Sequence, residues 1–186
     1  ISTSTNITLD NIGDKVYVRG VLSGDNISAN YTQFKMTGKI AAKGNCNSLW
    51  NYNDLNAPLK QCCGYRMFSG CTSLTTAPEL PATTLAHECY YYMFQGCTSL
   101  TTAPELPATT LAERCYTCMF WNCSILNYIK CLATDMSANS CTFNWVHGVA
   151  KTGTFVKAAD TSWPTGIGGI PSGWTVIEED NIVFEE

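Results

Sequence analysis

Apolar and polar positions recur along the middle of the chain with a fixed step, which is the distance from Met67 to Met93. Residues 67–86 read MFSGCTSLTTAPELPATTLA, and residues 93–112 repeat this string with Gln95 in place of Ser69. A third copy opens at Met119 and then diverges. A block of this length is too short to enclose a core of its own, so it must bury its apolar side against its neighbours. The pattern therefore predicts a solenoid of stacked rungs.

The side chains expected to face the core are those that stay apolar at the same position of successive copies. Each such position would form a column in which equivalent side chains pack on one another from rung to rung. The predicted columns are Leu74, Leu100 and Leu126; Ala77, Ala103 and Ile129; Leu80, Leu106 and Leu132; Leu85 and Leu111; and Phe68, Phe94 and Phe120. Burial of these columns is the first test of the rung alignment.

Each rung is expected to combine one short strand with one short helix. The segment LTTAPELP, at residues 74–81 and 100–107, favours extended backbone because threonine prefers strands and proline excludes a helix. Pro78 and Pro104 lack the N–H that pairs with a neighbour, so each strand must be very short. Residues 85–96 contain helix-forming residues and end in Gly96, which is typical of helix ends. The predicted fold class is α/β, with a parallel sheet of short strands on one face of the solenoid and short helices on the other.

The two ends of the chain are typical of irregular β structure that covers a repeat. Residues 7–44 contain alternating stretches, such as KVYVR at 15–19, between Gly, Asn and Asp turn residues. Residues 151–186 pass through Gly and Pro into the apolar stretches WTVI at 174–177 and IVF at 182–184. The expected organisation is an N-terminal β cap at 1–44, about four rungs at 45–150 and a C-terminal β cap at 151–186.

The repeat phrase resembles a known family. MFxGCTSLTTAPELP, together with GIPSGWTV at residues 169–176, is similar to the BspA-like leucine-rich repeats of surface proteins from gut Bacteroides and their relatives, over about residues 30–178. The resemblance implies a right-handed leucine-rich-repeat solenoid in an exported protein, located extracellularly or at the cell surface. It also implies adhesion or binding, without naming a ligand. The chain begins at Ile1 and shows no leader sequence, so a signal for such export is not among these residues.

Composition and charge narrow the range of partners. Hydrophobic residues make up 45% of the chain and charged residues 14%, which is typical of a globular protein and not of a disordered one. The formal net charge is −4 and the 11 Lys and Arg residues are scattered, so the sequence lacks a basic footprint for nucleic acid. No run of about eighteen apolar residues occurs, so no insertion of this segment into a membrane is expected. The expected partner is a host or bacterial surface protein or glycan.

The 11 cysteines raise the question of a disulfide framework. Most of them fall in two columns, and Val149 takes the next position of the second column. The columns are Cys63, Cys89, Cys115 and Cys141, and Cys46, Cys71, Cys97 and Cys123. Residues stacked about 4.8 Å apart are poorly placed for a disulfide, and a position that accepts valine needs apolar volume. Buried free thiols are therefore favoured over disulfides along the columns.

Cysteines outside the columns leave further alternatives open. Cys115 and Cys118 form a C-x-x-C, which suggests a redox or zinc site, but no second C-x-x-C completes it and Cys115 already belongs to a column. Coincidence is the favoured interpretation. The sequence allows a bond between Cys62 and Cys118 but does not support it. Cys131 falls in an alternating stretch and is expected in the core.

The chain offers no convincing catalytic constellation. His87 and His147 stand at positions that are polar in other copies, and neither belongs to a metal-binding or nucleophile motif. Glu79 and Glu105 occupy the same position of two rungs and could act as a carboxylate pair, but no apolar pocket is suggested around them. No catalytic residue, metal ligand or cofactor is predicted, and the chain is not expected to be an enzyme.

Two surfaces of the predicted solenoid could hold a ligand. On the helical side, where the copies differ most, aromatic side chains and an arginine would suit a protein or a glycan. On the strand side, rows of threonine would form the polar face on which solenoids commonly bind. The candidates are Tyr65, Arg66, Tyr91, Tyr92 and Trp121 on the first side and Thr75, Thr76, Thr101, Thr102 and Tyr128 on the second. The alternative is that tyrosines such as Tyr90 and Tyr116 only cover the apolar edge of the rungs.

The function predicted from these features is an exported binding or adhesion module that recognises a protein or glycan through the solenoid surface. The alternative is a non-binding spacer, or a phage-tail or receptor-binding scaffold, that lifts another domain from a surface. The two hypotheses differ in whether the aromatic side chains contact a partner.

Overall fold

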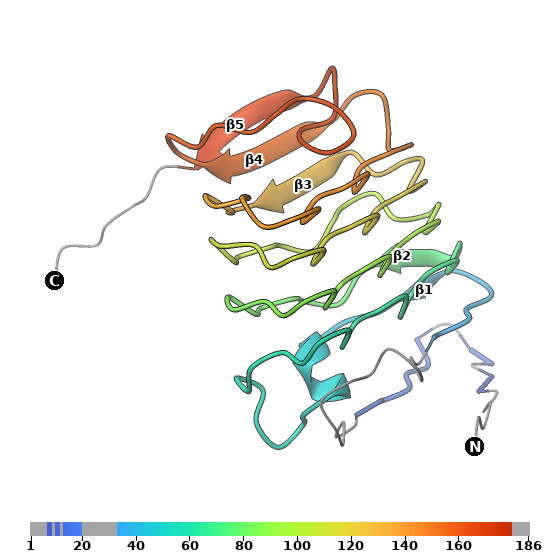
Figure 1. Ribbon diagram of the computed structural model, residues 1–186. Helices are drawn as coiled ribbons and strands as arrows, with labels where there is room; N and C mark the ends of the chain where they lie inside the picture. Colours follow the sequence, from blue (N-terminus) through green and yellow to red (C-terminus); the bar gives the residue numbers. More distant parts are fainter. Residues whose placement is uncertain (1–6, 9, 12, 20–32, 180–186) are drawn as a thin grey trace, which may run out of the picture.

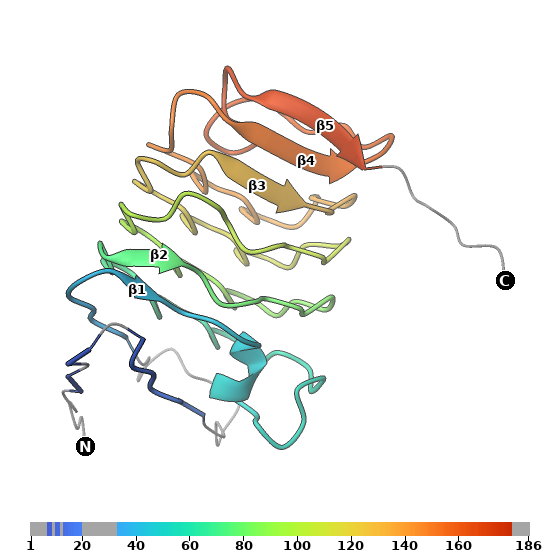
Figure 2. The same ribbon diagram turned by 180° about the vertical axis from the view of Figure 1, so that it is seen from behind.

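Successive coils of the chain stack on one another along one axis. The computed structural model describes residues 7–8, 10–11, 13–19 and 33–179. Figure 1 and Figure 2 show the coils lying one above the other, with strands along the same side of the stack. The elements in chain order are β1 (Ile40–Ala41), the 3-10 helix η1 (Cys46–Leu49), β2 (Leu74–Thr76), β3 (Tyr128–Cys131), β4 (Thr154–Ala158) and β5 (Thr175–Glu179).

The strands pair in parallel along the strand side. β1 pairs with β2, and β3, β4 and β5 form a second sheet in this order. Isolated parallel bridges, such as that between Thr102 and Tyr128, join rungs between the two sheets. The register of β3 and β4 joins Tyr128 to Thr154, which lies one repeat step later in the sequence. The pairing of β3 with β4 therefore follows the step of the sequence repeat, whereas Ile40 pairs with Leu74 and Thr154 with Thr175 at other spacings.

Proline decides how long these strands are. In the first copy β2 ends at Thr76, shortly before Pro78. The third copy has Lys130 where the first two have proline, and β3 continues through Lys130 to Cys131. A lysine keeps the backbone N–H that proline lacks, so the strand can extend by parallel pairing.

The opposite side of each rung is a ribbon of turns. Along residues 88–97, even-numbered residues donate their N–H to the next rung, and odd-numbered residues donate to the residue three positions earlier. Tyr92 N bonds to Thr117 O at 3.0 Å, for example, and Met93 N bonds to Tyr90 O at 3.1 Å. The helix predicted for residues 85–96 is therefore wrong. A helix satisfies its N–H groups within itself, whereas this ribbon uses alternate N–H groups to hold the neighbouring rung.

Left-handed backbone at every fourth residue produces the turn ribbon. Glu88, Tyr92 and Gly96 have φ values of 54°, 55° and 70°, and equivalent residues of the neighbouring copies are also left-handed. A residue other than glycine carries a steric cost of about 1–2 kcal/mol in this conformation. The hydrogen bonds between rungs offset that cost, because the left-handed residues let alternate N–H groups point toward the next rung.

The predicted leucine column is buried between the two sides. Leu74, Leu100 and Leu126 are each 0% exposed, which confirms the alignment of these rungs. The phenylalanine column is also buried, and its rings stack, with centroids 5.5 Å apart for Phe68 and Phe94. Offset stacking of this kind adds to the burial energy of the rings. The core is thus a set of continuous columns, as the repeat predicts.

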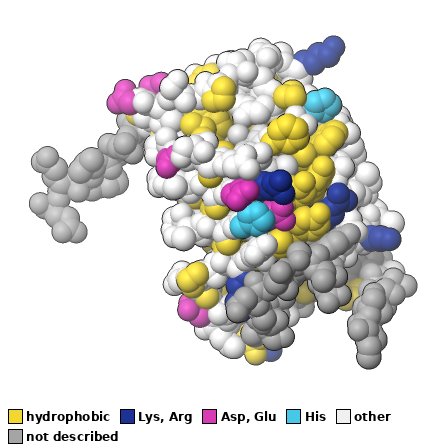
Figure 3. All heavy atoms as spheres, in the orientation of Figure 1, with side chains coloured by type: hydrophobic (Ala, Val, Ile, Leu, Met, Phe, Trp, Pro, Cys, Tyr) yellow, Lys and Arg dark blue, Asp and Glu magenta, His cyan; other side chains and the backbone are white. Residues whose placement is uncertain are grey.

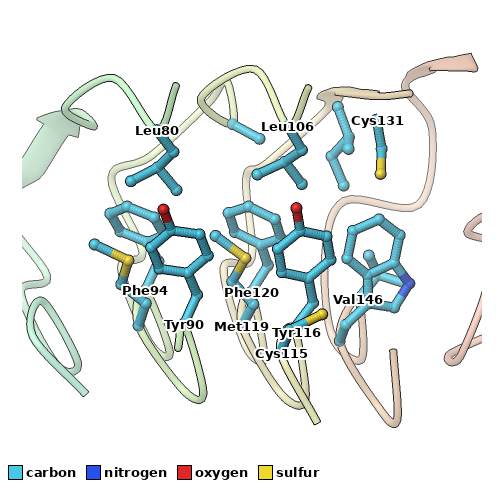
Figure 4. Close-up of a cluster of buried hydrophobic side chains, with 14 of the residues drawn as sticks. Leu80, Tyr90, Phe94, Leu106, Cys115, Tyr116, Met119, Phe120, Cys131 and Val146 are labelled. Carbon is cyan, nitrogen blue, oxygen red and sulfur yellow. The ribbon is translucent and has the colours of Figure 1, made fainter. Parts of the chain in front are cut away.

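A second aromatic column runs beside the phenylalanines. Tyr90 stacks on Tyr116 at 6.2 Å, and Tyr116 stacks on Trp145 at 6.1 Å. Figure 4 shows both tyrosines inside the rungs, with their hydroxyls directed toward the side of Leu80 and Leu106. Both are 1% exposed, so these two tyrosines are core residues and not ligand contacts.

One predicted column slips by a residue in the third copy. The repeat predicts Leu132 after Leu106, but Leu106 pairs with Cys131, and Cys131 is the buried residue. Leu132 is partly exposed, so its assignment to the column is wrong. The pairing with the preceding rung shortens by one residue between the bridge of Thr102 with Tyr128 and that of Leu106 with Cys131.

The alignment of Cys46 with Cys71 is also wrong. Cys46 N bonds to Glu79 O at 3.0 Å, whereas the thiol of Cys71 donates to Phe34 O at 3.0 Å. Phe34 stacks on Phe68, so the first coil runs from Phe34 to Met67 and is longer than the repeat step. The extra residues of this coil move Cys46 away from the position that its local sequence match suggests.

Both ends of the chain contribute strands to the stack. β1 lies within the predicted cap at 1–44 and pairs with β2, and β4 lies within the predicted cap at 151–186 and pairs with β3. Residues 15–19, expected to form a strand, form none, and Tyr17 is 89% exposed. The apolar stretch at 182–184 lies outside the described residues. The bounds of the three segments and the leucine-rich-repeat class stay predictions.

Candidate binding surface

Five aromatic rings form a continuous row across the turn side of the stack. This aromatic stripe consists of Tyr65, Tyr91, Tyr92, Trp121 and His147, all of them partly or fully exposed. The ring centroids lie 5.2 Å apart for the first pair, then 4.6 Å, 6.0 Å and 5.5 Å along the stripe. In Figure 3, hydrophobic side chains gather in a band on this side, with basic and histidine side chains beside it.

The turn ribbon sets the direction of these rings. Tyr65 and Tyr91 are one repeat step apart, as are Trp121 and His147, so each pair occupies one position of adjacent rungs. Equivalent side chains leave the stack in the same direction, and the rings of Tyr65 and Tyr91 lie parallel within 1°. The left-handed Tyr92 turns its ring onto Trp121 at an angle of 22°. The stripe is therefore preorganised by the backbone that joins the rungs.

Arg66 is a cation that packs against the rings of the aromatic stripe. Its guanidinium carbon is 4.5 Å from the centroid of Tyr92 and 5.8 Å from that of Tyr65. This is the geometry of a cation–π contact. Among the described residues, no carboxylate lies within ion-pair distance of Arg66. The guanidinium therefore keeps N–H donors that no acid of the described chain neutralises.

Two other cations of the stack, Arg114 and Lys130, are neutralised by acids. Arg114 pairs with Glu88 at 3.2 Å. On the strand side, Lys130 Nζ lies 3.1 Å from Glu105 and 2.8 Å from Glu179. The hydrogen bond to Glu179 is the main reason that the pKa of Lys130 is raised. The contrast singles out Arg66 as the cation of the stripe that is open to an anion.

Two tyrosines of the stripe, Tyr91 and Tyr92, have raised pKa values and stay protonated at neutral pH. Burial raises the pKa of Tyr92 above its usual range, and the neighbouring Cys118 thiol adds to this effect. Burial also raises the pKa of Tyr91. The Tyr91 hydroxyl can therefore donate a hydrogen bond to a ligand, whereas the Tyr92 hydroxyl is hydrogen-bonded to Cys118.

Stacking occupies the faces of the rings. Tyr91 is stacked on Tyr65, and Tyr92 lies between the Arg66 guanidinium and Trp121. The edge of His147 meets Trp121 at 67°. These contacts reduce the number of ring faces that the stripe leaves free for a ligand.

The threonine candidates lie on the strand side and form a separate set. Thr76, Thr101 and Thr102 are exposed, and the Thr75 hydroxyl donates to Ile40 O at 3.1 Å. Tyr128 is the first residue of β3 and is partly exposed. The structure thus brings Tyr65, Arg66, Tyr91, Tyr92 and Trp121 together and keeps the other five candidates apart from them.

All 11 cysteines are buried free thiols, and the predicted burial of the columns is confirmed. The thiols of Cys97 and Cys123 donate to the carbonyls of Phe68 and Phe94 at 3.1 Å and 3.0 Å. Burial raises the pKa of Cys123 to about 12, so the thiol stays protonated and is a poor nucleophile.

The C-x-x-C motif lies in the same environment as the cysteine columns. Burial raises the pKa of both Cys115 and Cys118, which disfavours the thiolates that redox chemistry or zinc would need. In the described part of the chain, no group of three or more His, Cys, Asp or Glu side chains could hold a metal ion.

The residues considered for catalysis have other partners. Glu105 pairs with Lys130, and His87 Nε2 lies 4.0 Å from a Glu88 oxygen. A depression of about 200 Å³ lies beside Val146 and Ile167, with Lys151 as the charged residue in its lining. It is smaller than the usual ligand pocket of about 300–1,000 Å³.

His147 belongs to the aromatic stripe, although the sequence pattern did not indicate it. Its position in the repeat suggested only an exposed polar site. The available signal was that His147 follows Trp121 by one repeat step, which places the two rings on adjacent rungs.

No model of a known protein family matches the chain, and comparisons with curated proteins and with solved structures give no match either. The resemblance to BspA-like repeats rests on the repeat phrase and stays a prediction. In the described residues, no helix has the length and apolar character needed to cross a membrane.

Proposed function

We propose that this chain is a binding module, not an enzyme, and that it recognises a partner protein through the aromatic stripe. The observation that supports this most is the contact of Arg66 with Tyr92 at 4.5 Å, within a row of stacked, partly exposed rings. Tyr, Trp and Arg are the residue types that most often dominate the energy of protein interfaces. Rings that are already ordered lose little conformational entropy when a partner binds.

A protein partner suits the stripe better than a glycan. A sugar ring stacks on a free aromatic face, whereas Tyr91 is already stacked on Tyr65, and Tyr92 already contacts Trp121 and Arg66. Ring edges and hydroxyl tips combine apolar contact with hydrogen bonding, which is how Tyr and Trp act in protein interfaces. Our proposal therefore favours the protein among the two partner classes expected from the sequence.

The strand side is expected to contribute less to binding. Its central cation, Lys130, is held between Glu105 and Glu179, and its threonines carry short side chains with little area to bury. Thr76, Thr101 and Thr102 then serve as a contact of low energy or as a solvated face. This ranking can be tested directly.

We also propose that the protein is exported and acts extracellularly or at the cell surface as an adhesion module. Support comes from the resemblance of the repeat phrase to BspA-like surface proteins. Protease accessibility on intact cells that express the native gene, compared with lysed cells, tests the location. Protection on intact cells would contradict it.

A non-binding spacer is the second candidate. It is favoured by the fact that stacked rings also join rungs in the core, as for Phe94 and Phe120 at 5.8 Å. On this view the aromatic stripe only stiffens the turn side. The two candidates differ in what removal of the rings does to binding.

Binding to a panel of purified extracellular proteins and glycans, measured by biolayer interferometry, tests the proposal. The double variant Tyr91→Ala with Trp121→Ala should weaken binding to a protein of the panel at least about tenfold. The matched variant Thr76→Ala with Thr101→Ala on the strand side should leave binding unchanged. Equal binding by the wild type and both variants would place the site elsewhere. Absence of any bound protein would favour the spacer.

A further inference from the structure

We propose that the occupant of the aromatic stripe is an acidic segment of the partner protein. An Asp or Glu carboxylate of that segment would bind Arg66, and an adjacent apolar side chain would pack beside Trp121. This inference rests on the proposed function and adds the chemical class of the ligand to it.

Arg66 offers an anion an oriented positive charge that no acid of the described residues neutralises. The planar guanidinium is held over Tyr92 and has no carboxylate partner among the described residues. A planar fork of N–H donors matches a carboxylate through two parallel hydrogen bonds. A cation that is oriented before binding gives up little freedom when this pair forms.

The stripe adds a further hydrogen-bond donor. Burial keeps the Tyr91 hydroxyl protonated by raising its pKa, whereas the Tyr92 hydroxyl is already hydrogen-bonded to the Cys118 thiol. Such a surface complements an acceptor-rich segment. A basic segment would instead meet Arg66 as a like charge.

Acids near the stripe are engaged elsewhere. Glu88, whose charge contributes to the raised pKa of Tyr91, is paired with Arg114 at 3.2 Å. The chain has a net charge of −4, but Glu105, Glu178 and Glu179 lie on the strand side, paired with lysines. An acidic segment can therefore approach the stripe without meeting an unpaired carboxylate among these residues.

The experiment selects peptides from a random phage-displayed library on the full wild-type chain. Clones that also bind the Tyr91→Ala, Trp121→Ala double variant are discarded, so that only stripe-dependent peptides are sequenced. Selected peptides are then synthesised, and their affinity is measured by tryptophan fluorescence. Four of the five tryptophans, Trp50, Trp145, Trp163 and Trp174, are buried, so Trp121 should report the contact.

The expected result is enrichment of Asp or Glu next to an apolar residue. Arg66→Gln should weaken these peptides on the order of tenfold or more, and Arg66→Lys should recover only part of the loss. The exposed Lys151→Gln, which changes the net charge equally, should have no effect. A peptide whose carboxylates are replaced by amides should bind the wild type and Arg66→Gln with equal affinity. Urea unfolding midpoints check that each variant is folded.

Each other result has a definite meaning. Stripe-dependent peptides without acidic bias, or with affinity unchanged by Arg66→Gln, would overturn this inference and leave the proposed function standing. Failure to obtain any stripe-dependent peptide would count against both. Arg66-dependent binding of the sulfated polysaccharide heparin, with no acidic peptide enriched, would replace the protein partner by a glycan and also overturn the inference.

Discussion

The strand side and the turn side of this stack join the same rungs by different backbone chemistry. On the strand side, extended residues such as Tyr128 and Thr154 pair in parallel, and the cation Lys130 is neutralised by two acids. On the turn side, a left-handed residue such as Tyr92 changes the direction of the backbone at every fourth position. The cation Arg66 packs there against aromatic rings. Backbone hydrogen bonds thus join the rungs on both sides, and the two sides differ in backbone conformation and in what their cations contact.

The two best copies of the repeat show this difference directly. Residues 70–86 and 96–112, which carry the strand side, are identical. Differences fall on the turn side, where Arg66 in one copy is Tyr92 in the next and both are left-handed. A ribbon that tolerates Arg, Tyr and Cys at one position can display a varied surface without loss of pairing.

Alkaline pH should cause the largest loss of stability, because all 11 cysteines are buried free thiols. Burial raises the pKa of these thiols, to about 12 for Cys63 and Cys123, so the folded chain keeps protons that the unfolded chain loses above pH of about 8.5. Stability is therefore fully present below that pH and falls as pH rises toward the folded pKa. Each thiol contributes about 1.4 kcal/mol per pH unit, and 11 thiols together should unfold the protein near pH of about 10.

Urea melts between neutral pH and alkaline pH, with a reducing agent present, measure this loss. The midpoint should be constant at neutral pH and collapse over a narrow alkaline range. A midpoint that declines only gradually would contradict the burial of the thiols.

Truncation of the core residue Leu100 should cause the next largest loss of stability, because its side chain is buried between the strand side and the turn side. It is 0% exposed and lies between Leu74 and Leu126 in its column. Leu100→Ala should lower the free energy of unfolding by about 2–5 kcal/mol. The exposed neighbour Thr101→Ala should change it by less than about 0.5 kcal/mol. Equal losses in urea melts would require a new alignment of the rungs.

Substitution by glycine should have opposite signs on the two sides. Ser140 on the turn side is exposed and left-handed, with φ of 54°, so Ser140→Gly should raise stability by about 0.5 kcal/mol. Thr101 on the strand side is exposed without positive φ, and Thr101→Gly should lower stability by about 1 kcal/mol. Thermal melts of both variants compare the signs. A loss in both would mean that the turn ribbon does not depend on left-handed backbone.

Removal of the strand-side cation should have an effect as small as that of the glycine substitutions. Lys130→Met leaves Glu105 and Glu179 without their partner and should cost about 0.5–1 kcal/mol, less at high salt. The pKa of Lys130 is raised, so its contribution is present at neutral pH and is lost above pH of about 10.4, as the folded lysine deprotonates. Urea melts at low and high salt provide the measurement. A loss that does not change with salt would show that Lys130 acts through packing.

The 26-residue repeat by itself determined which residues face the core and which rungs adjoin. Leu100, Phe94 and the column of Cys63, Cys89, Cys115 and Cys141 could be assigned because burial requires the same apolar side chain at the same place in each rung. The aromatic and arginine candidates of the turn side could also be found, because they interrupt an otherwise uniform surface.

Only the tertiary structure decided the backbone of the turn side and the contacts of the stripe. Residues 85–96 have helix-forming composition, but their N–H groups bond to the neighbouring rung, and that partner is invisible to local propensity. Cys131 replaces Leu132 in the core because strand pairing shifts the register, and Cys46 leaves its expected column because the first coil is longer. The contact of Arg66 with Tyr92 likewise depends on two rungs lying side by side. Periodicity specifies what must be buried, whereas the bonds between rungs specify the path that the backbone takes to bury it.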